Sequence, residues 1–185
     1  MFARPDYPRL SAQEFMRIDF GELKAELDDG VVRIVAGATA RQAQVQGNIL
    51  TALTERLRGT GYAPYNSAMP VRTHDRSIRR PDVAVYHGRA GPENDDFKMF
   101  DDPRVIFEVL SSGTARTNLR EKLDEYKAMP SVDTIVFVDI ATERLRVVQR
   151  TGPGGWSDER HADLVDLPLP SIGATLPHRE LFARR

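Results

Sequence analysis

The chain has 185 residues, which suits one domain spanning residues 1–185 with one substantial core, and its 41% hydrophobic and 29% charged residues are typical of a globular protein. Its net charge of −1, from 26 lysines and arginines against 27 aspartates and glutamates, argues against tight non-specific DNA binding but is compatible with a local basic cleft. The chain has no cysteine and no long apolar run, and its first residues lack the apolar segment of a secretory signal. We therefore expect a cytoplasmic protein without disulfides, thiolate metal sites or membrane contacts.

The first predicted elements are a short helix and a β-hairpin. Ser11 and Glu14 have the spacing of a capping box, which predicts the start of a helix. Residues 23–27 and 31–35 predict two strands, and the Asp-Asp-Gly sequence between them is typical of a tight turn.

A long amphipathic helix is predicted next, from an N-cap at Thr39 to the Gly-Thr-Gly sequence at residues 59–61. Its apolar stripe consists of Val45, Ile49, Leu53 and Leu57. Its outward face is expected to carry Gln42, Gln46, Thr54 and Arg58.

The middle of the chain predicts two strands that each carry a carboxylate. Residues 83–85 and those before them, including Asp82, predict one strand. Residues 105–110, Val-Ile-Phe-Glu-Val-Leu, are almost continuously apolar, as expected of a strand covered on both faces. Glu108 is the only charge in this run, and a buried carboxylate is costly unless a cation or hydrogen bonds meet it. A partner for Glu108 is therefore expected nearby.

A second helix follows, with Thr117 as its predicted N-cap. Its inner stripe consists of Leu119, Leu123 and Tyr126. Helical geometry places Lys122 at the edge of this stripe. Lys122 is thus positioned to meet Glu108, either as a catalytic amine or as the partner in a buried ion pair.

The remaining elements complete an α/β pattern. Residues 133–140 predict a strand and residues 143–150 its hairpin partner, and the tail from His161 predicts short strands and a final turn. The order of helices and strands indicates a central mixed β-sheet flanked by helices, with the two carboxylate strands at its centre.

The residues on these strands indicate a chemistry. Two converging carboxylates, Asp82 and Glu108, can hold a hard divalent cation, and the ammonium of Lys122 can steady a phosphate or a nucleophile. This set is the minimum for a metal-dependent phosphodiesterase. Arginines on both sides of the carboxylates are either phosphate contacts or parts of solvated loops: Arg72, Arg76, Arg79, Arg80, Arg116 and Arg120.

Several stretches, in order along the chain, carry a family resemblance. They are ELDDGVV from Glu26, RRPDVAVY, IFEVLSSGTARTNLREKLDEY, VDTIVFVDI and the closing PSIGATLPHRELFA. Together they resemble the Uma-two family of restriction-endonuclease-like proteins, from about residue 11 to residue 182. The resemblance implies the PD-(D/E)xK nuclease fold, with a Mg²⁺ site that Mn²⁺ can also occupy.

The resemblance also implies roles for individual residues. The metal-binding aspartate and glutamate fall on Asp82 and Glu108, and the carbonyl of Val109 is expected to complete the metal's shell. The lysine usually found two residues after the glutamate is replaced by leucine here, so the amine is expected from Lys122. Glu26 is expected near the site as an extra ligand, unless it is only a solvated strand residue.

Two positions depart from the family pattern. Asn118 stands where the family commonly has aspartate, and Arg41 where a histidine is common at the start of the long helix. An arginine at this position can bind phosphate.

The expected function is that of a Mg²⁺-dependent endonuclease that hydrolyses DNA phosphodiester bonds, paired as a homodimer by analogy of fold. The main alternative is a catalytically inactive nuclease-fold module that binds nucleic acid or a protein partner. A third is metal-dependent chemistry on a smaller phosphorylated substrate. Residues 88–102 form the longest predicted loop and are the candidate for sequence specificity.

Overall fold

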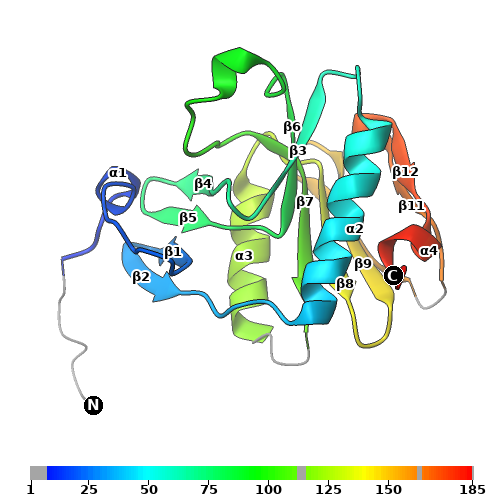
Figure 1. The fold of residues 1–185 in the computed structure, drawn as a ribbon, viewed down its shortest axis with the longest axis horizontal. Helices are drawn as coiled ribbons and strands as arrows, with labels where there is room; N and C mark the ends of the chain where they lie inside the picture. The colour runs from blue at the N-terminus through cyan, green and yellow to red at the C-terminus, as the bar shows by residue number, and fades with distance from the viewer. Residues whose placement is uncertain (1–7, 112–115, 162–163, 185) are drawn as a thin grey trace.

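The computed structural model describes residues 8–111, 116–161 and 164–184, excluding the side chains of residues 116–118 (Figure 1). Its largest layer is a six-stranded sheet in the order β10-β9-β8-β7-β6-β3. The strands are β3 (Tyr62–Asn66), β6 (Val83–His87), β7 (Pro103–Leu110), β8 (Thr134–Asp139), β9 (Arg144–Gly152) and β10 (Gly155–His161). Only the β7–β8 pair is parallel, so the sheet is mixed, as predicted.

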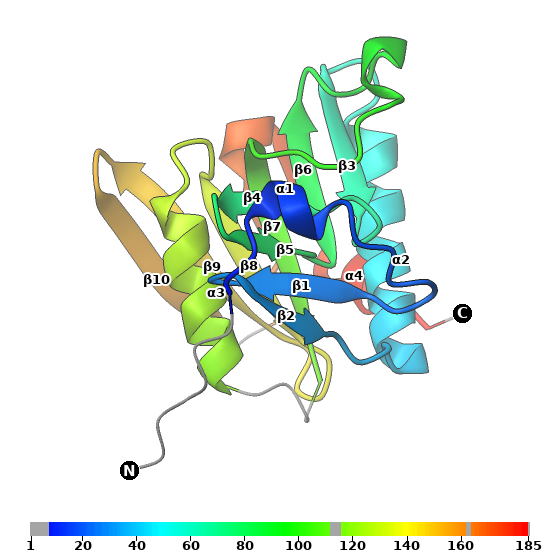
Figure 2. The ribbon, with the colours of Figure 1, turned by 90° about the vertical axis from the view of Figure 1, so that its left-hand side faces the viewer.

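Two long helices cover opposite faces of this sheet (Figure 2). Helix α2 (Ala40–Arg56) begins at Thr39, whose side chain and that of Gln42 form a capping box, and its predicted apolar stripe is buried. Helix α3 (Arg116–Ala128) packs Leu123 against the other face. Its predicted N-cap at Thr117 is wrong, because the helix already includes Arg116 and an N-cap has a non-helical backbone.

A smaller, four-stranded sheet lies beside the large one, in the order β2-β1-β5-β4. Its strands are β1 (Ala25–Asp28), β2 (Val31–Ile34), β4 (Val71–His74) and β5 (Ser77–Arg79). Helix α1 (Ala12–Phe15) packs on it, and its predicted capping box of Ser11 and Glu14 is present. The predicted β1–β2 hairpin is confirmed.

The predicted strand through Asp82 is in fact two strands in two sheets. Strand β5 belongs to the small sheet and β6 to the large one. Pro81 separates them, and proline has no N–H with which to continue a ladder of hydrogen bonds. Asp82 therefore lies where the chain passes from one sheet to the other.

The C-terminal part completes the core under α2. The predicted β8–β9 hairpin is present, while β10 had no clear signal because its residues are mostly polar. After it come β11 (Leu167–Leu169), the 3₁₀ turn η2 (Pro170–Ile172), β12 (Ala174–Leu176) and α4 (His178–Leu181). A further 3₁₀ turn, η1 (Pro92–Asn94), lies between β6 and β7. No helix in the described part of the chain is long and apolar enough to cross a membrane.

Candidate carboxylate–lysine site

A cavity of about 470 Å³ opens where β1, the start of α2 and the end of β7 meet. It contains the predicted site residues Glu26, Asp82, Glu108 and Lys122 together with Val109. Its other polar residues are Lys24, Thr39, Gln42, Gln46, Ser67, Arg80 and Ser111. The structure thus brings together residues from the small sheet, the large sheet and α3.

Glu108 is held by side chains of α3. It is 6% exposed, and its Oε1 accepts hydrogen bonds from the Tyr126 hydroxyl at 2.7 Å and from Lys122 Nζ at 3.2 Å. Lys122 and Tyr126 are four residues apart, so both project from one side of the helix toward β7. The partner that the buried carboxylate required is therefore present.

Among the described residues, the hydrogen-bond donors to Asp82 are neutral. Its Oδ1 accepts from Gln46 Nε2 at 2.7 Å, and its Oδ2 accepts from the backbone N–H of Val109 at 2.5 Å. Gln42 Nε2 donates to the carbonyl of Val109 at 3.1 Å. Two glutamines of α2 thus orient the oxygen atoms on this side of the cavity.

The prediction that Gln42 and Gln46 face outward is wrong. Gln42 precedes Ile49 by seven positions, and seven residues are almost two full helical turns. Gln42 and the buried Ile49 therefore lie on the same side of α2. Gln46 follows Gln42 by four positions on that side. Their spacing relative to the apolar stripe was the signal that could have placed them in the site.

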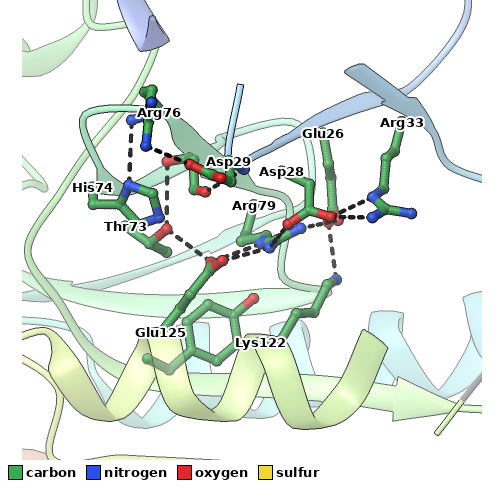
Figure 3. Close-up of polar contacts among 12 residues, drawn as sticks. Glu26, Asp28, Asp29, Arg33, Thr73, His74, Arg76, Arg79, Lys122 and Glu125 are labelled. Atoms are coloured by element: carbon green, nitrogen blue, oxygen red, sulfur yellow. Dashed lines mark hydrogen bonds and ion pairs between the residues drawn. The ribbon is translucent and has the colours of Figure 1, made fainter. Parts of the chain in front are cut away.

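Glu26 lies in a buried network of charges rather than in solvent (Figure 3). Its Oε1 accepts from Lys122 Nζ and from the backbone N–H of Arg80, both at 2.9 Å. The reading of Glu26 as a solvated strand residue is therefore wrong. Its catalytic role remains a prediction.

Arg79 forms the centre of an adjoining group, which we call the Arg79 cluster: Arg79, Asp28 and Glu125 (Figure 3). The Arg79 side chain is 3% exposed; its Nη2 donates to Asp28 at 2.7 Å and to Glu125 at 2.5 Å, and its Nε donates to Glu125 at 2.7 Å. It also lies 3.7 Å from Glu26. The cluster thus joins the small sheet to α3 one turn away from Lys122.

The flanking arginines have different environments. Arg72 pairs with Asp101 and Arg76 with Asp29, both in exposed positions, and neither lines the cavity. Arg80 does line it, and donates from Nη1 to the carbonyls of Ser67 and Ala68. Of the arginines that precede Asp82, only Arg80 among the described residues is therefore placed to meet a ligand in the cavity.

Two other predicted features lie elsewhere. Arg41 donates to the carbonyl of Phe182 at 2.9 Å and pairs with Glu143 at 3.0 Å, so it holds the C-terminal segment instead of facing the cavity. Residues 88–102 follow the end of β6, whereas Asp82 precedes its start, so this loop lies at the opposite end of the strand (Figure 1). The side chains of Arg116 and Asn118 are outside the described residues.

Burial and neighbouring charges shift the pKa values of three groups in the cavity. Burial, together with the nearby charge of Glu108, raises the pKa of Asp82 to about 7. Burial also raises the pKa of Glu108, against the opposing effect of Lys122. Burial alone would lower the pKa of Lys122, but Glu108 and Glu26 outweigh it and raise that pKa, so the ammonium stays charged.

The oxygen donors of the site are of the class that Mg²⁺ prefers: Asp82 and Glu108 supply carboxylates and Val109 a carbonyl. A divalent cation between the carboxylates would offset the repulsion that raises the pKa of Asp82, so the residues fit such an ion. Within the described residues, no group of three or more histidine, cysteine, aspartate or glutamate side chains is arranged to hold a metal.

Comparisons with known proteins agree with this architecture. A sequence model of the family described as "Uma2: Putative restriction endonuclease" matches residues 12–179. The uncharacterized protein sll1609 of Synechocystis sp. is 24% identical over 149 residues, which are 80% of this chain and 84% of that protein.

A solved structure is similar over almost its whole length. The crystal structure of a "putative nuclease belonging to DUF820" from Anabaena variabilis has a TM-score of 0.78 and 15% identity, and the match covers 94% of this chain and 98% of that one. The predicted restriction-endonuclease-like α/β fold is confirmed by this match.

Proposed function

This chain belongs to the Uma2 family, and on that basis we propose that it is a Mg²⁺-dependent endonuclease that hydrolyses DNA phosphodiester bonds. The observation that carries the proposal is the meeting of Asp82, Glu108 and Lys122 in one cavity, from three separate elements. The raised pKa of Asp82 adds support, because acids with perturbed pKa values in a cavity are characteristic of functional sites.

Asp82, Glu108 and the carbonyl of Val109 would hold Mg²⁺, with Mn²⁺ as a substitute. When bound, such an ion supplies a Lewis acid for the phosphate and lowers the pKa of a bound water. Gln46 and the N–H of Val109 fix both oxygens of Asp82, and Gln42 fixes the Val109 carbonyl. These contacts hold the oxygen donors in place before a ligand arrives.

Lys122 supplies the positive charge of the site. It is held between Glu26 and Glu108, at 2.9 and 3.2 Å. From this position an ammonium can stabilise the negative charge that develops on a phosphate during hydrolysis. Glu26 then serves to orient Lys122.

The second candidate is a catalytically inactive nuclease-fold module that binds nucleic acid or a protein partner. The observation that favours it is that Lys122 already forms ion pairs with both Glu26 and Glu108, so these two carboxylates have a buried partner without a metal ion. Metal binding distinguishes the two candidates.

The test is cleavage of supercoiled and single-stranded DNA with Mg²⁺ or Mn²⁺, beside calorimetric titration of the same ions. We expect Asp82→Asn to lose both cleavage and metal binding, whereas Asp96→Asn, a change at an exposed aspartate, should retain them. Metal binding without cleavage would favour a smaller phosphorylated substrate. A folded protein with neither activity would favour the inactive module.

We extend the proposal to a homodimer, because a nuclease of this size can cut both strands of a duplex by pairing. This part rests on analogy of fold. Light scattering during size-exclusion chromatography, over a range of protein concentrations, measures the mass directly, and a constant monomer mass would contradict it.

A further inference from the structure

A second, larger cavity of about 840 Å³ lies between α3 and the part of the large sheet that α3 does not cover. We call it the α3 groove. Its floor is apolar and includes Leu123 of α3 and Phe137 of β8. Its rim is formed by β9 and β10, whose residues Arg146 and Arg160 lie side by side in register next to Phe137. The groove thus has an apolar base and a charged border.

The border is mainly positive. Arg120, Arg144, Arg146 and Arg160 line the groove, against the carboxylates of Asp124 and Asp139. Arg146 pairs with Asp158 at 2.6 Å, whereas no ion pair joins the other arginines to a carboxylate within the described residues. All of these other arginines are exposed. Cationic groups without a bonded carboxylate are suited to an anionic ligand.

The α3 groove adjoins the carboxylate–lysine cavity. Leu110 and Leu119 line both cavities, so the two share a wall at the end of β7 and the start of α3. A polymer with one phosphate beside Asp82 and Glu108 would have to pass only this shared wall to reach the α3 groove.

We propose that the α3 groove binds a single-stranded segment of nucleic acid that leads out of the carboxylate–lysine cavity. The inference rests on the proposed function for the choice of nucleic acid as the ligand. Arg144 and Arg160 contact the phosphates along the rim, and the unpaired bases lie against the apolar floor.

Arg146 gives the groove a surface for a base. Its guanidinium lies 5.3 Å from the centre of the Phe137 ring, and Nε and Nη2 both donate to Asp158, at 2.8 and 2.6 Å. A guanidinium plane fixed in this way can stack on an exposed base. The paired bases of a duplex do not offer their faces, so the groove favours a single strand.

The experiment measures binding of a short fluorescent single-stranded oligonucleotide by anisotropy, without divalent ions and in an Asp82→Asn background. Arg144→Gln combined with Arg160→Gln removes two rim charges. The matched control, Arg17→Gln combined with Arg58→Gln, removes two exposed charges outside both cavities. We expect the rim variant to bind about tenfold or more weakly, with a salt dependence reduced by roughly 0.7 per lost phosphate contact, and the control to match its parent.

Equal affinity of the rim variant and its parent, equal losses in rim and control variants, or no binding by the parent would each overturn the proposal. Unlabelled duplex DNA, polyglutamate and single-stranded DNA are then compared as competitors. Equal displacement of the oligonucleotide by duplex DNA or by polyglutamate would also overturn the proposal. The binding assay does not depend on cleavage, so failure of the groove proposal can be distinguished from failure of the proposed nuclease function. Wild-type protein that cuts DNA while the rim variant binds normally would overturn only the groove, and groove-dependent binding without cutting would overturn only the nuclease.

Discussion

The Arg79 cluster and the carboxylate–lysine site lie next to each other in this molecule and differ in the partners of their acidic side chains. In the Arg79 cluster, burial raises the pKa of Asp28, but hydrogen bonds and charge from arginine outweigh it and leave that pKa below its ordinary value. Asp82 meets neutral donors and lies near Glu108, so its pKa is raised to about 7. Arginine thus outweighs the burial of Asp28, whereas the nearby Lys122 and Lys24 do not outweigh the burial of Asp82 and the charge of Glu108.

This difference indicates a structural role for the Arg79 cluster and a functional role for the site around Asp82. A balanced buried cluster stabilises the arrangement of its elements and needs nothing further, whereas an unbalanced one is maintained at a cost to stability. Lys122 lies between the two, because Glu26, which it contacts, also lies near Arg79.

The largest effect is expected from Arg79→Met. This change leaves the partly buried Glu125 without its cation and Asp28 with only the exposed Arg33, so the free energy of unfolding should fall by roughly 3–5 kcal/mol. Arg72→Met, which removes an exposed pair with Asp101, should cost about 1 kcal/mol or less. Urea denaturation measures both, and similar small losses would show that the Arg79 cluster is not what holds the sheet to α3.

Lys122→Met should have the next largest effect. It leaves Glu26 and Glu108 without their ammonium, and we expect a loss of about 3 kcal/mol in the free energy of unfolding above neutral pH. Part of this loss should be recovered in acid, because Glu108, whose pKa is already raised, becomes neutral. Urea curves at several pH values test this, with the exposed Lys98→Met as control; a loss independent of pH would contradict it.

Asp82→Asn should stabilise the metal-free protein in alkali. The pKa of Asp82 rises from an ordinary 3.8 to about 7 on folding, so its stabilising contribution is full below pH 3.8 and is lost as pH rises through about 7. The variant should therefore exceed the wild type by about 1–3 kcal/mol at high pH, and the difference should shrink in acid. Thermal unfolding across pH measures it. A less stable variant at high pH would show that the site is already balanced.

Asp28→Asn should show the opposite pH dependence with a smaller amplitude. The pKa of Asp28 is lowered on folding, so its contribution is present above its ordinary pKa of 3.8 and is lost as pH falls through the lowered value. The wild type should exceed the variant by about 1–2 kcal/mol at neutral pH, with no difference in strong acid. Acid titration of stability for both proteins provides the test, and a difference that persists in strong acid would contradict the lowered pKa.

The parts of the fold and site that followed from sequence have local signals. A capping box marked the start of α1 and an N-cap that of α2, and the single charge in the run of residues 105–110 indicated that Glu108 is a buried acid. Lys122 followed from helical spacing alone. These features depend on residues close together in the chain.

The parts that were missed depend on contacts between distant residues. Arg79 was one of several arginines in a row, and its burial follows from a meeting with Glu125, 46 residues further along. Likewise, Pro81 is a local signal that the strand is interrupted, but no local pattern indicates that β5 and β6 join different sheets. Gln42 and Gln46 were misplaced although their spacing was available, because polar residues on a helix were assumed to face solvent.

The passage between the two sheets has a consequence for how this chain can vary in length. Within four consecutive positions, the Arg79 side chain enters the charged cluster, the N–H of Arg80 bonds to Glu26, and Asp82 reaches the cavity. One inserted or deleted residue would shift every later contact by one position. The side chain of Asp82 would then no longer face the cavity. Relatives should therefore tolerate insertions in residues 88–102, at the far end of β6, and none between Arg79 and Asp82.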